Sequence, residues 1–219
     1  MSEDEAREAY ENAHARSLRQ YCGWSFVNAR PQRLGVAVSG GSDSMALLDL
    51  MIWQGKDKGF EVRAVTVDHG LRPEARDEAA MVAAFCKSRG VCHDVLTWEG
   101  WNGTGNLQAK ARKVRYALIA DWALKKGVDW IALGHTKDDQ AETVLMRLAR
   151  GSGVDGLAGM PDQFERGGLH FVRPLLSLER EELRDYLRHQ GISWCDDPSN
   201  VDDSFERVRT RKVAAVLGD

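Results

Sequence analysis

Between residues 33 and 150 the sequence alternates short apolar runs, rich in β-branched residues, with longer stretches of helical character. Such alternation predicts βαβ units, in which parallel strands are joined by helices that cover the sheet. Because these crossovers are right-handed, every strand then ends at the same edge, where α/β sheets bind ligands. We therefore expect an α/β fold with a parallel sheet in a three-layer sandwich. Its strands are predicted at 34–38, 60–67, 91–96 and 130–133, and its helices at 44–53, 73–88, 106–126 and 138–150.

The flanking segments are less regular. Residues 3–21 lack turn formers and predict a helix, so we interpret 1–30 as an N-terminal helical extension and 31–219 as the main domain. A glycine-rich stretch at 151–168 predicts a long loop. After it we expect a strand at 170–173, a helix at 178–189 and an arginine-rich terminal stretch.

Composition narrows the class of protein. With 219 residues, 43% of them hydrophobic and 29% charged, the chain can bury a globular core without disulfides or metals. No apolar run reaches the ~18 residues that a membrane span needs, and the acidic N-terminus is unlike a secretory signal. The scattered cysteines form no CxxC pair, which is typical of a reducing cytoplasm; they are Cys22, Cys86, Cys92 and Cys195.

The net charge of −3 argues only weakly against a nucleic-acid partner. Basic residues concentrate at 110–115 and 207–212, while acidic residues gather elsewhere, including the N-terminal extension. Because binding to a polyanion depends on how charge is distributed, the sequence leaves such a partner open.

The turn after the first predicted strand reads Ser39-Gly40-Gly41-Ser42-Asp43-Ser44 and leads into a helix. Adjacent glycines let the backbone adopt positive φ and approach a ligand closely. Hydroxyls, backbone N–H groups and the helix N-terminus could then surround a phosphate. The lysine of a Walker loop is missing, which excludes that class of nucleotide site. A plain strand-to-helix turn with a Ser or Asp cap is the alternative.

The run 36–44 resembles the SGGxDS signature of the PP-loop ATP pyrophosphatases. This resemblance implies a Rossmann-like, adenine-nucleotide α-hydrolase-like domain that grips the phosphates of ATP and cleaves between the α and β phosphates. It also implies that Asp43 lies near a metal ion. On this basis residues 31–219 are expected to form a PP-loop ATP pyrophosphatase catalytic domain.

Charged residues follow the second and fourth predicted strands at the same sheet edge. They are Asp68, His69 and Arg72 after the second strand, and His135, Asp139 and Glu142 after the fourth. Asp139 and Glu142 are three residues apart, so on a helix they share a face near its positively polarised N-terminus. There they could bind Mg²⁺ or an ammonium group. A helix N-cap with acidic first-turn residues is the simpler alternative.

Several segments together resemble the tRNA(Ile)-lysidine synthase family within the PP-loop group. In order they are DHGLR at 68–72, GHTxDDQAET at 134–143, RLARGSGxxGLxGM at 147–160, RPLL at 173–176 and DPSN at 197–200, and the likeness runs from about residue 33 to 211. It implies a ligase that uses ATP, Mg²⁺ and L-lysine to modify the wobble cytidine of tRNA(Ile) with a CAU anticodon. The cytosine C2 oxygen attacks the α-phosphate, pyrophosphate leaves, and the lysine ε-amine then replaces AMP at C2.

The same resemblance implies roles for individual residues. Catalysis is expected to use Asp43, Asp139, Glu142, Arg112 and Arg115; ATP binding to use Ser39, Gly40, Gly41, Ser42, Asp43, Ser44, Asp68, His69 and His135; metal binding to use Asp43 and Asp139; and RNA binding to use Arg150, Arg207 and Arg211. Arg112 and Arg115 belong to an ARxxRY pattern, for which a solvated helix face is an equal alternative. Which carboxylate holds Mg²⁺ and which holds lysine stays open.

Two features depart from the family pattern. Val208 and Thr210 stand where the family usually has Asn and Ile, although the neighbouring arginines are present. Family members also continue into domains that recognise tRNA, whereas this sequence ends at Asp219, so we expect those C-terminal domains to be absent.

Other functions are kept as alternatives. A PP-loop enzyme that modifies another tRNA base, such as a thiolase, typically carries CxxC motifs or a catalytic cysteine pair, and the GMP and asparagine synthetases carry a glutaminase. A nucleotide-binding module without activity of its own would bind ATP and release no pyrophosphate. The leading hypothesis predicts tRNA(Ile) and L-lysine as partners, no membrane, a cytoplasmic location and a possible homodimer.

Overall fold

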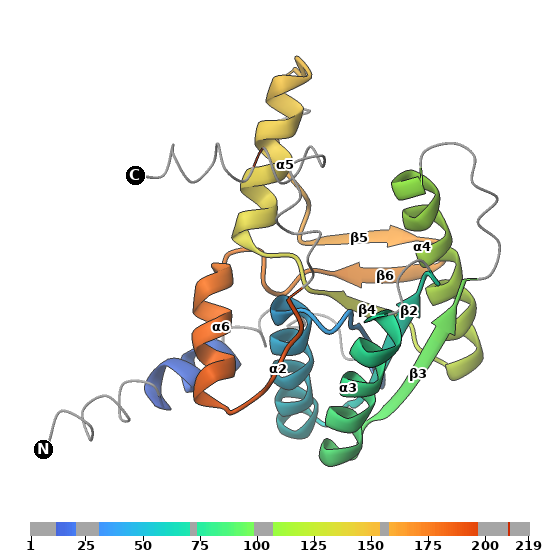
Figure 1. Ribbon diagram of the computed structural model, residues 1–219, viewed down its shortest axis with the longest axis vertical. Helices are drawn as coiled ribbons and strands as arrows, with labels where there is room; N and C mark the ends of the chain where they lie inside the picture. Colours follow the sequence, from blue (N-terminus) through green and yellow to red (C-terminus); the bar gives the residue numbers. More distant parts are fainter. Residues whose placement is uncertain are drawn as a thin grey trace, which may run out of the picture.

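The computed structural model describes residues 12–20, 31–70, 74–98, 107–153, 158–196 and 210. Its centre is a six-stranded sheet with the order β3-β2-β1-β4-β6-β5 (Figure 1). The strands are β1 (Arg33–Ala37), β2 (Glu61–Asp68), β3 (Cys92–Thr97), β4 (Trp130–Leu133), β5 (Gln163–Arg166) and β6 (Leu169–Val172). The helices are α2 (Ser42–Lys58), α3 (Glu74–Arg89), α4 (Leu107–Lys126), α5 (Lys137–Ala149) and α6 (Arg180–His189). The α/β fold expected from the alternation is confirmed.

Strand β5 corrects the expectation of a loop over 151–168 and of an entirely parallel sheet. It pairs antiparallel with β6, whereas the other strand pairs are parallel. The two strands are joined by Gly167 and Gly168, with φ of 60° and 76°. Positive φ at both central residues is what a tight two-residue hairpin turn requires. The glycines that suggested a loop therefore form a hairpin at the edge of the sheet.

Side chains of the sheet alternate between two hydrophobic cores. Leu34 and Val36 of β1 pack into one core with residues of α2, α3 and α6. Ile131 and Leu133 of β4 belong to the second core, which α4 covers. Because successive strand residues point to opposite faces, the two cores lie on either side of the sheet, which gives the three layers (Figure 1).

The described part of the N-terminal segment, residues 12–20, is helical and packs on the main domain. Ala15 and Leu18 are each 3% exposed and join the core beneath α2 and α6. Arg19 Nη2 donates to Gln190 Oε1 at 2.8 Å. In the described part of the chain, no helix is long and apolar enough to cross a membrane.

Strand order reverses at β1, which has β2 on one side and β4 on the other. The loops after β1 and β4 therefore leave the same sheet edge side by side, and such a switch point is where α/β sheets form ligand crevices. The chain just after β4 approaches the start of α2 closely. A Cβ built on Gly134, just after β4, would lie 3.2 Å from the backbone of Asp43 and Ser44. The predicted site residues that follow these two strands are thus brought together.

Candidate active site

The loop after β1 is held by its own hydrogen bonds at the start of α2. Ser44 Oγ donates to the Gly41 carbonyl at 2.9 Å and accepts from the Ser39 backbone N–H at 3.1 Å. Gly40 has φ of 92°, and its carbonyl accepts from the backbone N–H of Cys195 at 2.9 Å. Gly41 is the N-cap of α2 and contributes no side-chain hydrogen bond. The positive end of the helix is therefore available to an anion.

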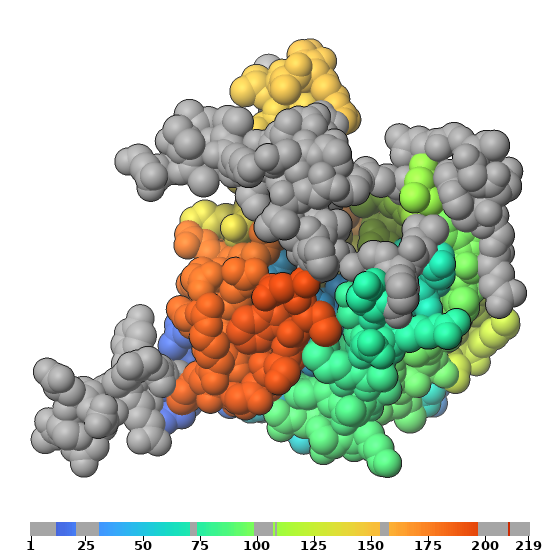
Figure 2. Space-filling view, in the orientation of Figure 1, coloured from blue at the N-terminus to red at the C-terminus, as the bar shows by residue number. Residues whose placement is uncertain are grey.

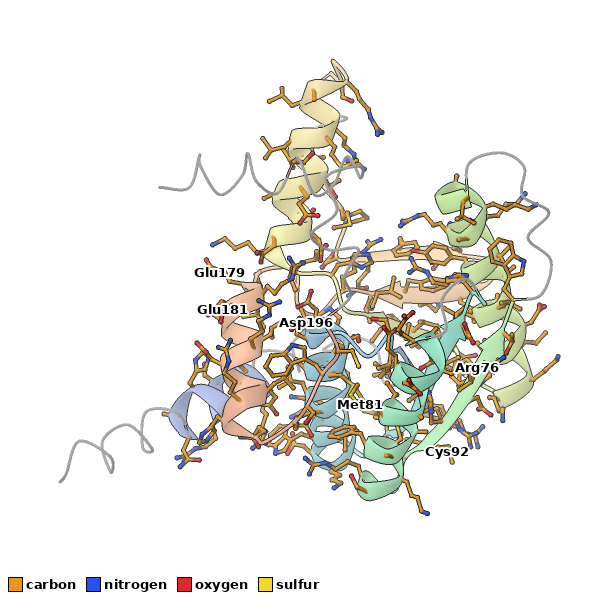
Figure 3. The ribbon with its side chains drawn as sticks, in the orientation of Figure 1. Arg76, Met81, Cys92, Glu179, Glu181 and Asp196 are labelled. Carbon is orange, nitrogen blue, oxygen red and sulfur yellow. The ribbon has the colours of Figure 1, made fainter. Side chains whose placement is uncertain are left out.

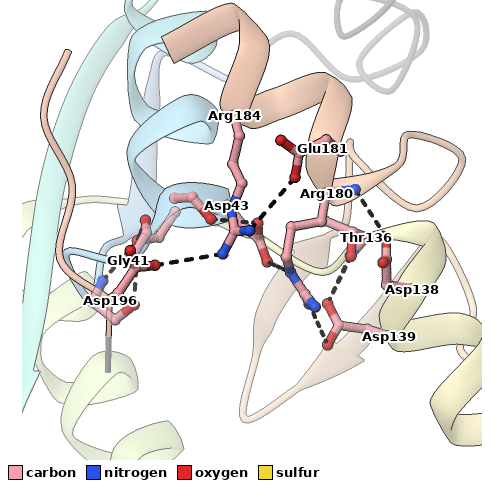
Figure 4. A network of polar contacts seen from close by, with 12 residues as sticks. Gly41, Asp43, Thr136, Asp138, Asp139, Arg180, Glu181, Arg184 and Asp196 are labelled. Atoms are coloured by element: carbon pink, nitrogen blue, oxygen red, sulfur yellow. Dashed lines mark hydrogen bonds and ion pairs between the residues drawn. The ribbon is translucent and has the colours of Figure 1, made fainter. Parts of the chain in front are cut away.

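One guanidinium links the two carboxylates that were predicted to bind a cation. Arg180 Nε donates to Asp43 Oδ2 at 2.9 Å, and Arg180 Nη2 lies 3.6 Å from Asp139 Oδ1 (Figure 4). The three side chains are only 13–17% exposed. The Arg180 backbone N–H also donates to Asp138 Oδ2 at 2.9 Å. The N-terminal ends of α2, α5 and α6 therefore meet at this site.

Asp139 is both a helix cap and a member of this site. Its Oδ2 accepts from the backbone N–H of Thr136 at 2.9 Å and from Thr136 Oγ1 at 3.2 Å, as in a capping box. Its Oδ1 faces Arg180. Glu142, one turn further along α5, is only 1% exposed. Asp139 can therefore cap α5 through Oδ2 and still present Oδ1 to the site, so the two interpretations of this residue are compatible.

The environment shifts the protonation equilibrium of Asp43. Burial raises its pKa above the ordinary value, the Arg180 guanidinium opposes that rise, and the nearby Asp139 adds to it. For Arg180, burial alone would lower the pKa, but Asp43 and Asp139 raise it above the ordinary value. The arginine therefore stays charged and favours the ionised form of Asp43.

Three ATP-site candidates, Asp68, His69 and His135, follow β2 and β4 at the same edge of the sheet and make local contacts. Asp68, at the end of β2, accepts from the Gly70 backbone N–H at 2.8 Å. His69 packs edge-on against Trp98, with ring centroids 5.8 Å apart. Burial, and then the charge of Arg115, lower the pKa of His69. His135 follows β4, and its backbone N–H donates to Leu133 at 3.0 Å.

The arginine candidates are spread more widely. The guanidinium carbons of Arg112 and Arg115 lie 5.5 and 5.7 Å from the ring centroid of Tyr116 on α4. Arg150 follows the C-terminal end of α5, which by helical rise is about 15 Å from Asp139. Arg72, Arg207 and Arg211, and the 197–200 motif, lie outside the described residues.

Arg180 was missed by the sequence interpretation. Helix 178–189 reads as an ordinary charged amphipathic helix, with no distinctive motif around Arg180. A positional signal was present, because α6 follows strand β6 just as α2 follows β1 and α5 follows β4. Residues in the first turn after a parallel strand of this sheet lie at the edge where ligands bind, and the same position after β6 is that of Arg180.

The carboxylates suit a magnesium ion that is shared with a nucleotide. Within the described ranges, no group of three or more His, Cys, Asp or Glu side chains could form a metal site by itself. Mg²⁺ is commonly held by one or two carboxylates together with phosphate oxygens. Asp43 and Asp139, beside the loop 39–44, match that requirement.

Comparisons with known proteins identify relatives of the chain. A family model described as PP-loop domain matches residues 11–217. The tRNA(Ile)-lysidine synthase of Ruegeria pomeroyi is 48% identical over 203 residues, which is 93% of this chain and 48% of that protein. The tRNA(Ile)-lysidine synthase of Rhizobium meliloti is 48% identical over 207 residues, covering 89% of this chain and 45% of that protein. The chain thus spans about half the length of the curated relatives that it matches.

Solved structures share the fold at low identity. The U34-tRNA thiolase NcsA from Methanococcus maripaludis has a TM-score of 0.80 at 17% identity, covering 94% of this chain and 74% of that chain. An NH3-dependent NAD synthetase from Campylobacter jejuni has a TM-score of 0.55 at 14% identity, covering 95% of this chain and 83% of that chain. At such identities the likeness shows the architecture alone.

Proposed function

The chain belongs to the PP-loop domain family, and from this premise we propose that it catalyses ATP-dependent formation of lysidine. In this reaction L-lysine is joined to C2 of the wobble cytidine of a tRNA(Ile) with a CAU anticodon, in the cytoplasm, with AMP and pyrophosphate as products. The observation that carries the proposal is that Asp43, in the loop 39–44, meets Asp139 and Arg180. Curated tRNA(Ile)-lysidine synthases at 44–48% identity support the choice of substrate.

The first step, adenylation of the cytidine, takes place where the loop 39–44 binds the phosphates of ATP. The N-terminus of α2, which has no side-chain cap hydrogen bond, and the positive φ of Gly40 suit close contact between backbone N–H groups and phosphate oxygens. Asp43 and Asp139 would hold Mg²⁺, which when bound offsets the charge that develops on pyrophosphate. The C2 oxygen of cytosine then forms a bond to the α-phosphorus, and the bond to pyrophosphate breaks.

The second step requires a neutral amine. Asp139 and Glu142 lie on one face of α5, largely buried, and suit the capture of a lysine ε-ammonium group. The ammonium group first gives up one proton, and the neutral amine then attacks C2, which forms the C–N bond and expels AMP. We assign acceptance of that proton to this carboxylate pair, because the two are the buried acids on the α5 side of the site.

The test is AMP formation that depends on both tRNA and lysine. The 219-residue chain is incubated with Mg²⁺, labelled ATP, labelled lysine and a CAU-anticodon transcript, with a GAU-anticodon transcript as the control RNA. We expect lysine to enter the CAU transcript only, in proportion to AMP. Absence of incorporation, even after the C-terminal part of the Ruegeria relative is added, would refute the proposal. ATP binding without turnover would instead identify a nucleotide-binding module.

A further inference from the structure

Helix α6 carries a second arginine, Arg184, one turn after Arg180. Side chains on a helix lean toward its N-terminus, so Arg184 is directed back toward the end where Arg180 meets Asp43 (Figure 4). Its Nη2 lies 3.4 Å from Asp196 Oδ1. Asp196 directly follows Cys195, whose backbone N–H donates to the Gly40 carbonyl. Arg184 is thereby tied to the segment that lies against the phosphate loop.

That segment, residues 190–196, lies against the N-terminal end of α2. Residues 190–196 pass in front of α2 in the ribbon view (Figure 1) and lie between α6 and α3 in the space-filling view (Figure 2). Asp196 lies between α6 and α2, while Glu179 and Glu181 lie at the start of α6 (Figure 3). Cys195 O is 3.9 Å from a Cβ built on Gly41. The loop 39–44 and the Arg184 side chain therefore share one corner of the molecule.

The donors of Arg184 are weakly engaged. Its Nε is buried and has no hydrogen-bond partner among the described residues. Its other contacts are long ion pairs, 3.5 Å to Glu181 and 3.4 Å to Asp196, whose side chains are 59% and 75% exposed. Exposed pairs of this kind contribute little free energy. The Arg184 guanidinium can therefore exchange these carboxylates for another anion with little loss of free energy.

Arg180 and Arg184 differ in this respect. Arg180 is held by two largely buried carboxylates, whereas the carboxylates that Arg184 faces in the described part of the chain are solvated. A guanidinium binds a phosphate through two parallel hydrogen bonds, which are stronger than its bonds to an exposed carboxylate. We propose that Arg184 binds the pyrophosphate portion of ATP, exchanging Glu181 and Asp196 for phosphate oxygens. This inference rests on the proposed function and extends it by naming a pyrophosphate ligand outside the loop 39–44.

The experiment measures pyrophosphate and AMP binding to the whole chain by calorimetry at fixed Mg²⁺. Arg184→Gln should weaken pyrophosphate binding about tenfold or more and leave AMP binding unchanged, because AMP lacks the pyrophosphate group. Arg184→Lys should fall in between. Arg188→Gln is the matched control, since Arg188 is on the same helix, 51% exposed, and pairs with Glu181 and Asp185.

Asp196→Asn separates phosphate binding from a structural tether. If Arg184 binds pyrophosphate, this variant frees its guanidinium and should bind pyrophosphate at least as tightly as the parent. A loss as large as that of Arg184→Gln would mean that the Arg184–Asp196 pair only anchors the 190–196 segment, and would overturn the inference. Parental pyrophosphate binding by Arg184→Gln, or an equal loss of AMP binding, would overturn it as well. A parent chain that binds neither ATP nor pyrophosphate would overturn the proposed function too.

Discussion

Arg180 forms ion pairs with two acidic side chains, Asp43 and Asp139, whose negative charges would otherwise repel each other in a largely buried site. Its guanidinium lies 2.9 Å from Asp43 and 3.6 Å from Asp139. Water reaches little of either carboxylate, so burying its negative charge without a cation nearby would cost free energy. The arginine therefore fixes their separation and orientation as well as their charge, and this is a positioning role.

Arg180→Gln should accordingly impair both turnover and stability. Removing one partner leaves buried charge uncompensated, so the free energy of unfolding should fall by about 3 kcal/mol. Loss of alignment should lower kcat by about 100-fold, with a smaller change in KM for ATP because the loop 39–44 is intact. The conservative variant Arg180→Lys should keep more of kcat than Arg180→Gln does. A parental kcat per folded molecule, from kinetics corrected by calorimetry, would show that alignment does not depend on Arg180.

Asp139 allows charge and capping to be separated. Its Oδ2 caps α5 through Thr136, and an asparagine oxygen can accept the same hydrogen bonds. Asp139→Asn should abolish AMP formation with little change in the melting temperature, whereas Asp139→Ala should lose activity and also about 1 kcal/mol of stability. Activity and thermal unfolding of the two variants check this. An active Asp139→Asn enzyme would exclude a role for the negative charge.

Among the elements, those that could be predicted were the ones whose sequence pattern reflects burial. β1 and β4 are apolar because both faces are covered, and glycine or proline marks the ends of several neighbouring helices. β5 escaped prediction because an edge strand with the sequence QFER is mostly exposed and carries no apolar pattern. Its signal was the adjacent glycine pair at 167–168. The Asp43–Arg180–Asp139 contact depends on tertiary packing, which no local pattern encodes.

Gly35 sets the distance between β1 and α4. A Cβ at this position would lie 2.6 Å from Ile131 Cδ1 and 2.9 Å from Trp122 Cζ3. Gly35→Ala should therefore lower the free energy of unfolding by about 1–3 kcal/mol through overpacking. Adding Ile131→Val removes the closest atom and should recover part of the loss. Urea unfolding of the single and double variants measures this coupling, and an additive double variant would contradict the steric explanation.

Asp94 couples edge strand β3 to α4 in a pH-dependent way. Its Oδ2 accepts from Trp122 Nε1 at 2.9 Å and its Oδ1 from Lys126 Nζ at 3.1 Å. Burial alone would raise the pKa of Asp94, but these two hydrogen bonds, together with the charges of Lys126 and Arg63, lower the pKa below the ordinary 3.8. A lowered pKa in the folded state means stabilisation that is present above that value and disappears as the pH falls through the folded pKa.

We therefore expect Asp94→Asn to be less stable than the parent at pH 7, by no more than about 1 kcal/mol because the pair is partly exposed. The difference should shrink as the pH falls below 3.8. Urea unfolding of the two proteins across this range provides the measurement. A difference that stays constant with pH would show that the negative charge of Asp94 is not what stabilises this contact, because an asparagine oxygen can still accept the hydrogen bond from Trp122.

For the whole molecule, the net charge of −3 conceals a local concentration of positive charge. The guanidinium carbons of Arg112, Arg115 and Arg166 lie 5.5, 5.7 and 4.3 Å from the Tyr116 ring centroid. Arg166 belongs to β5, so the hairpin adds a cation to the cluster that the sequence had placed on α4 alone. Arg112 and Arg166 are exposed and can reach a polyanion.

If this arginine cluster binds the tRNA backbone, its contribution should depend on salt. Each cation that contacts a phosphate releases counterions, so Arg166→Ala and Arg112→Ala should each weaken tRNA binding and reduce the slope of log Kd against log salt by about 1 or less. Arg33→Ala is the control, because Arg33 pairs with Glu61 at the start of β1, and β1 is three strands away from β5 in the sheet order. Filter binding from low to moderate salt measures the slopes. Equal slopes for all three variants and the parent would place the RNA contact elsewhere, whereas a reduced slope for the first two alone would assign it to the face formed by α4 and β5.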